Sequence, residues 1–93
     1  MKINTVIIDD EANARENLQL LINEYCPELN IVGMASSISQ GKILIKQFEP
    51  DLVFLDVAMP GGDGFELLNQ FEDRDFSVVF ITAHSEYALK AFK

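Results

Sequence analysis

Two uninterrupted apolar runs that end in aspartate constrain the fold of this chain more than any other feature. Residues 5–8 lead into Asp9 and Asp10, and residues 52–55 lead into Asp56. Apolar runs of this length without polar alternation are typical of strands covered on both faces, as in a parallel sheet between helices. Ligands of such sheets bind beyond the carboxyl ends of the strands. The sequence therefore predicts that carboxylates from two strands converge at one edge of a parallel sheet.

Carboxylates that crowd together need a physical reason to do so. Like charges repel, and each carboxylate loses favourable contacts with water when it is buried. A bound cation or a catalytic role would offset that cost, and Mg²⁺ is favoured because it prefers carboxylate, carbonyl and water oxygens. The alternative is that Asp9, Asp10 and Glu11 cap the helix that follows, since acidic residues are favoured at helix N-termini.

Length and composition indicate one small domain with a hydrophobic core, because 48% of the 93 residues are apolar and seven are Phe. Seven basic and fifteen acidic side chains give a net charge of -8, which argues against direct binding of nucleic acid or an anionic membrane by this segment. No apolar stretch reaches the length of a membrane span, and the first strand begins too early for a signal peptide to precede it. Cys26 is the single cysteine, so no disulfide or zinc spacing is present. We expect a cytoplasmic protein.

Apolar runs alternate with helical patterns along the chain. Strands are expected at residues 2–8, 30–35, 52–55 and 77–81. Helices are expected at residues 12–25, from a serine N-cap at residues 36–39 to residue 48, around residues 65–71, and from residues 85–86 onward. Residues 59–64, rich in Gly and Pro, predict a turn. The fourfold βα alternation predicts right-handed crossovers and an open parallel sheet. Gly41 is a weakness of about 1 kcal/mol within the second helix.

Four segments together resemble the receiver domain of bacterial response regulators. They are the acidic pair at residues 9–10, Asp56, the DVAMPGGDG segment at residues 56–64, and the ITA segment at residues 81–83. Residues 51–56 and 83–92 are most similar to receivers attached to LytTR-type DNA-binding domains. The resemblance implies a two-component signalling module that is not an enzyme. In this family a sensor histidine kinase donates a phosphoryl group to an aspartate with the help of Mg²⁺, which controls an output domain, here a transcriptional one outside this chain.

The resemblance also implies roles for individual residues. Asp56 resembles the phospho-acceptor. Asp9 and Asp10 resemble the acidic pair that holds Mg²⁺, with Asp10 as a direct ligand and Asp9 acting through water. The backbone carbonyl of Ala58 would be a further ligand, and Asp56 itself would contact the metal. Thr82 resembles the hydroxyl that moves toward the phosphoryl group after transfer.

The fold that the resemblance implies is α/β and flavodoxin-like, a three-layer open parallel sheet with strand order 2-1-3-4. The fifth strand of the family, with its lysine, and the fifth helix have no counterpart in residues 1–93. We therefore expect a receiver domain over residues 1–93 that is incomplete at its C-terminus. The fourth strand would then be an exposed apolar edge, so a receiver homodimer or self-association through that edge is expected.

Other functions on this type of sheet are less consistent with the sequence. An aspartate-nucleophile phosphohydrolase would need a second acid two positions after Asp56, where this chain has Ala58. A dimerisation module that works without phosphorylation stays open, although the complete acid set argues against it. Nucleotide binding is disfavoured because neither a P-loop nor a GxGxxG segment follows the first strand.

Overall fold

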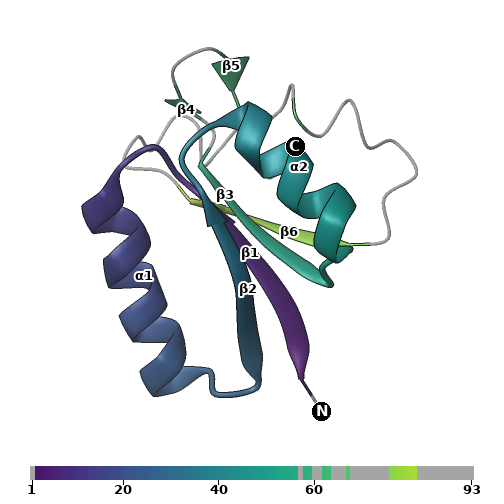
Figure 1. Cartoon of the computed structure of the whole chain (residues 1–93). Helices are drawn as coiled ribbons and strands as arrows, with labels where there is room; N and C mark the ends of the chain where they lie inside the picture. The colour runs from purple at the N-terminus through teal and green to yellow at the C-terminus, as the bar shows by residue number, and fades with distance from the viewer. Residues whose placement is uncertain (1, 57, 60–61, 64–66, 68–75, 82–93) are drawn as a thin grey trace.

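A four-stranded parallel sheet with helices on both sides forms the part of the chain that the structure describes. The computed structural model describes residues 2–56, 58–59, 62–63, 67 and 76–81. The sheet consists of β1 (Ile3–Ile8), β2 (Leu29–Ala35), β3 (Leu52–Asp56) and β6 (Ser77–Ile81), in the order β2-β1-β3-β6. The helices are α1 (Ala12–Tyr25) and α2 (Ile38–Phe48), and they lie on opposite sides of the sheet (Figure 1). The predicted α/β class and strand order 2-1-3-4 are confirmed, with β6 as the fourth strand.

Strand β1 is covered on both faces, as its apolar run predicted. Val6 and Ile8 belong to the core cluster that also contains Ile38 and Ile45 of α2. Because side chains alternate along a strand, Ile7 faces the opposite side, where α1 lies, and it is also fully buried. Burial of a Val or Ile side chain contributes roughly 1.5–3 kcal/mol, so β1 is the centre of the hydrophobic core.

Both ends of α2 are defined by local hydrogen bonds. Ser37 is the N-cap, and its side chain accepts a hydrogen bond from the Gln40 backbone N–H at 3.2 Å. The Gln40 side-chain oxygen accepts in turn from the Ser36 backbone N–H at 3.0 Å. The first bond satisfies an N–H group that the start of a helix leaves without a partner, and the second ties Ser36, which precedes the N-cap, to Gln40. The C-cap is Glu49, which adopts a left-handed conformation with a φ of 45°. The predicted serine cap is confirmed and is Ser37.

Gly41 lets α2 approach the sheet closely. A Cβ atom at this position would lie 2.6 Å from Cδ1 of Ile8 and 3.3 Å from Cδ1 of Leu67. Both neighbours are fully buried, so neither can move without disturbing the core. The glycine that lowers helix propensity in α2 therefore has a packing role.

Of residues 59–64, for which the sequence predicts a turn, the structure describes residues 59, 62 and 63. Their backbone contributes to a short antiparallel pair, β4 (Ala58–Met59) and β5 (Gly62–Asp63), with Ala58 opposite Asp63. This strand pairing was not predicted from the sequence. Strand β1 begins one residue later than predicted, and β2 one residue earlier.

Two predicted helices lie outside the described residues. They are the helix from residues 85–86 and, apart from Leu67, the helix around residues 65–71. Neither α1 nor α2 is long and apolar enough to cross a membrane.

Candidate metal centre

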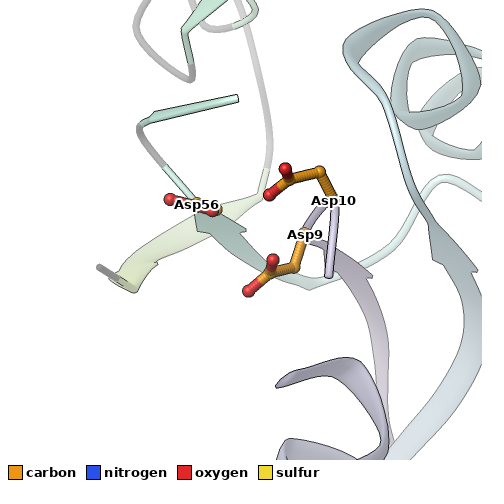
Figure 2. Close-up of side chains that lie close together, drawn as sticks. All are labelled: Asp9, Asp10 and Asp56. Carbon is orange, nitrogen blue, oxygen red and sulfur yellow. The ribbon is translucent and has the colours of Figure 1, made fainter. Parts of the chain in front are cut away.

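Strand register brings two aspartates to the same edge of the sheet. Ile8 of β1 is the register partner of Leu55 of β3, and the two strands are parallel. Asp9 follows Ile8 and Asp56 follows Leu55, so both acids lie at the carboxyl edge of the sheet. Figure 2 shows their side chains and that of Asp10 grouped where β1 and β3 end. The structure thus brings together the three acids that the sequence placed at the ends of two strands.

The spacing of the three carboxylates fits a single small cation. One oxygen from each of Asp9, Asp10 and Asp56 lies within 4.8 Å of the others. Oxygen ligands at about 2.1 Å from an octahedral Mg²⁺ are roughly 3–4 Å apart. The carboxylates can therefore share one ion if one of them binds through a water molecule, since Mg²⁺ usually keeps several waters.

Burial differs among the three acids. Asp9 is buried, with 7% of its surface exposed, whereas Asp56 is half-buried and Asp10 is exposed. Removing a carboxylate from water is costly unless it is hydrogen-bonded or paired with a cation. Asp9 meets this requirement in part, because its Oδ1 accepts a hydrogen bond from the Glu11 backbone N–H at 3.0 Å. Its second oxygen can still serve a cation or a water bound to one.

Side-chain hydrogen bonding does not support the helix-capping alternative, although Glu11 stands at the N-cap position of α1. The Glu11 side chain makes no capping hydrogen bond. The first turn of α1 contains no acidic residue. Asp9 bonds the N–H of Glu11, which precedes the helix, so it orders the connection between β1 and α1 and does not cap α1.

Arg15 contacts this connection and was not singled out from the sequence. Its Nη1 donates a hydrogen bond to the backbone carbonyl of Asp9 at 2.7 Å. Its backbone N–H donates to the carbonyl of Glu11 at 3.1 Å. The sequence feature that could have drawn attention to Arg15 is its four-residue spacing from Glu11. That spacing, however, predicts an ion pair on the surface of a helix. The contact with a main-chain carbonyl depends on the path of the loop, which the spacing does not reveal.

A cavity of about 340 Å³ opens beside the carboxylates. Asp9 and Asp56 line its polar part. Its apolar part is lined by Leu18 and Leu21 of α1 and by Ile81 of β6, among others. Apolar walls lower the local dielectric constant, so charges at the rim of this cavity interact more strongly than they would in water.

Two other predicted site residues are described less fully. Ala58 belongs to β4, directly beyond residue 57, and pairs with Asp63. That its carbonyl binds the metal stays a prediction. Thr82 follows the last residue of β6 and lies outside the described residues, so its role also stays a prediction.

Comparisons with known proteins identify relatives of the chain. The family described as response regulator receiver domain matches residues 5–93. Transcriptional regulatory protein BtsR of Escherichia coli (strain K12) is 40% identical over 93 residues, which cover 98% of this chain and 38% of BtsR. Sensory transduction protein LytT of Oceanobacillus iheyensis is 35% identical over 100 residues, which cover 100% of this chain and 39% of LytT. The chain therefore spans less than half the length of these relatives.

A solved structure shares the fold. It is a two-component response regulator of the LuxR family from Aurantimonas sp. SI85-9A1, with a TM-score of 0.84 and 29% sequence identity. The match covers 99% of this chain and 68% of that chain. The parallel sheet and its helices are therefore arranged as in this response regulator.

Proposed function

The chain belongs to the response regulator receiver family, and from this premise we propose that Asp56 is its phospho-acceptor and that Asp9 and Asp10 hold Mg²⁺ beside it. Receivers of this family are phosphorylated signalling domains that partner with sensor histidine kinases and bind Mg²⁺ in an acidic pocket. The observation that supports the proposal most directly is the grouping of three carboxylates within 4.8 Å at the end of β1 and β3.

The donor set suits the metal of the family. Asp9, Asp10 and Asp56 would hold the ion, with the backbone carbonyl of Ala58 as a further oxygen ligand. Bound Mg²⁺ supplies charge neutralisation for the phosphoryl oxygens during transfer. The exposed Asp10 is suited to direct coordination. The buried Asp9, whose Oδ1 is already hydrogen-bonded to Glu11, is suited to a contact through water.

Asp56 has the position that a nucleophile needs. In the proposed transfer, a carboxylate oxygen of Asp56 forms a bond to phosphorus while the bond between phosphorus and the kinase histidine nitrogen breaks. Asp56 ends β3, which is paired with β1 on one side and with β6 on the other, where Asp56 is in register with Ile81. A residue held in this way keeps its direction, which favours in-line attack. Thr82, the next residue after Ile81, would supply the hydroxyl that binds the phosphoryl group.

The wider assignment follows from the relatives. We infer that residues 1–93 form one receiver domain of a cytoplasmic regulator whose output is transcriptional. BtsR is named as a transcriptional regulatory protein and LytT as a sensory transduction protein. Within the described part of the chain, β6 pairs with β3 only, and Val79 of β6 is 42% exposed. Self-association through this edge is therefore part of the proposal.

The test is phosphorylation of the chain by a small-molecule phosphodonor such as acetyl phosphate. With Mg²⁺, intact mass spectrometry should detect the addition of one phosphoryl group, and removal of Mg²⁺ by chelation should abolish it. Asp56→Asn should not be labelled. Glu24→Gln, which removes one exposed charge at the far end of α1, should be labelled like the wild type. Equal labelling of the Asp56→Asn variant, or no labelling of the wild type, would contradict the proposal.

A further inference from the structure

We infer that Arg15 is a positioning residue for the metal centre and that it holds the Asp9–Asp10 peptide in the orientation in which both carboxylates meet Asp56. The inference rests on the proposed function, because it assumes that the three carboxylates bind a cation. Arg15 is a basic residue near the three carboxylates and would not itself bind the cation.

Arg15 is attached to the β1–α1 connection at two points. Its Nη1 donates to the carbonyl oxygen of Asp9 at 2.7 Å, which is short for a hydrogen bond to a neutral acceptor. Its backbone N–H donates to the carbonyl oxygen of Glu11 at 3.1 Å and so belongs to the first turn of α1. The side chain is half-buried, which restricts its movement. Arg15 therefore provides α1 with a restrained hydrogen-bond donor that anchors the connection between β1 and α1.

The hydrogen bond from Arg15 to the Asp9 carbonyl also restrains the peptide that leads into Asp10. The carbonyl of Asp9 and the N–H of Asp10 belong to one planar peptide group, so a bond to the oxygen restricts rotation of the whole plane. Neighbouring groups are also held, because the Asp9 N–H donates to Ala35 at 3.0 Å and the Glu11 N–H donates to the Asp9 side chain at 3.0 Å. Asp10 is exposed, so burial does not set its direction. Arg15 thus supplies the restraint on the peptide that leads into Asp10.

Two physical effects of Arg15 on a cation have opposite signs. A guanidinium near the site repels Mg²⁺, so removal of its charge would tighten binding if charge were its main effect. If positioning is the main effect, removal lets the peptide rotate and weakens binding. The geometry favours positioning, because Nη1 bonds a main-chain carbonyl whose orientation determines where two ligands point.

The experiment is a titration of the purified chain with MgCl₂ by calorimetry, well below the melting temperature of each variant. Arg15→Met keeps an apolar stem and removes both charge and donors, and we expect Mg²⁺ affinity to fall about tenfold, the usual effect of losing a group that orients metal ligands. Arg15→Lys keeps one donor and the charge, and should recover most of the affinity. Lys46→Met removes the same charge from an exposed position near the end of α2 and should leave the affinity unchanged.

A second readout does not depend on the metal. In metal-free protein, the amide of Glu11 should exchange with solvent several times faster in Arg15→Met than in the wild type, because its acceptor on Asp9 is less well held. Unchanged or tighter Mg²⁺ binding by Arg15→Met would overturn the inference while leaving the proposed function intact. Absence of Mg²⁺ binding by the wild type would overturn both. If Arg15→Met does not fold, Arg15→Ala takes its place as the variant without the side-chain donor. Mg²⁺ affinity and Glu11 amide exchange equal to those of the wild type would then overturn the inference.

Discussion

The carboxylates of Asp9 and Asp56 lie within 4.8 Å of each other although one follows β1 and the other ends β3. Each residue directly follows one member of the last register pair between β1 and β3, which is Ile8 and Leu55. The register of two parallel strands therefore sets the separation of two acidic groups. A shift of this register by one residue would turn the Asp56 side chain to the opposite face of the sheet. The three carboxylates would then no longer lie together.

The first prediction concerns the charge of Asp56. In metal-free buffer, Asp56→Asn should raise the free energy of unfolding by about 1 kcal/mol, because it removes one of three carboxylates that repel each other. Mg²⁺ at about 100 times its Kd should stabilise the wild type by about 2.7 kcal/mol, and Asp56→Asn should lose most of this gain. Thermal unfolding with and without MgCl₂ measures both effects.

Glu24→Gln is the control for this prediction, since it removes one exposed negative charge distant from the site. It should respond to Mg²⁺ like the wild type. An Asp56→Asn variant with an undiminished response to Mg²⁺ would show that the cation binds elsewhere.

The second prediction concerns the opposite edge of the sheet. Asp51 Oδ2 accepts a hydrogen bond from the Asn4 backbone N–H at 3.0 Å. The main chain of Asp51 also bonds Asn4 and Ser77, so this residue links the starts of β1, β3 and β6. Asp51→Ala should lower the free energy of unfolding by about 1 kcal/mol, because it removes a charged acceptor from a backbone donor.

Asp51→Asn keeps an acceptor oxygen and should cost less than half as much as Asp51→Ala. Chemical denaturation of the two variants makes the comparison. Identical losses would mean that the charge of Asp51 matters and its hydrogen bond does not. Neither variant should change Mg²⁺ affinity if the register of the sheet is retained.

Much of this fold could be predicted because its signals are local. The bounds of α1 at residues 12–25 follow from its amphipathic pattern and from Pro27, and the structure has the same bounds. Strands β3 and β6 follow from short apolar runs. The convergence of Asp9 and Asp56 could be predicted because the carboxyl ends of parallel strands lie at one edge of the sheet. This prediction does not require the exact register of the strands.

Features that depend on distant contacts could not be predicted in the same way. Gly41 looked like a defect in a helix, because its contacts with Ile8 and Leu67 are absent from the local sequence. The bond from Arg15 to the carbonyl of Asp9 depends on the path of a loop. The pairing of β4 with β5 depends on main-chain geometry that the composition of a turn does not specify.

The third prediction tests the packing role of Gly41. Gly41→Ala should lower the free energy of unfolding by about 1 kcal/mol, because overpacking a core typically costs about 1–3 kcal/mol and the gain in helix propensity is about 1 kcal/mol. Ser39→Ala is the matched control, since Ser39 is an exposed residue of the same helix. It should be neutral or slightly stabilising. Stabilisation by Gly41→Ala to the same extent would contradict the close approach of α2 to Ile8, and urea denaturation of both variants decides the question.

The fourth prediction concerns the C-cap of α2. Glu49 has a φ of 45°, a left-handed conformation that costs an L-residue about 1 kcal/mol or more and costs glycine little. Glu49→Gly should therefore raise the free energy of unfolding by about 1 kcal/mol, measured by thermal or urea denaturation. Part of any gain could come from removing a negative charge at a helix C-terminus, where the helix dipole disfavours it. Glu49→Ala removes the same charge but keeps the Cβ, so it should gain clearly less than Glu49→Gly. Equal gains would assign the effect to charge and would refute the conformational explanation.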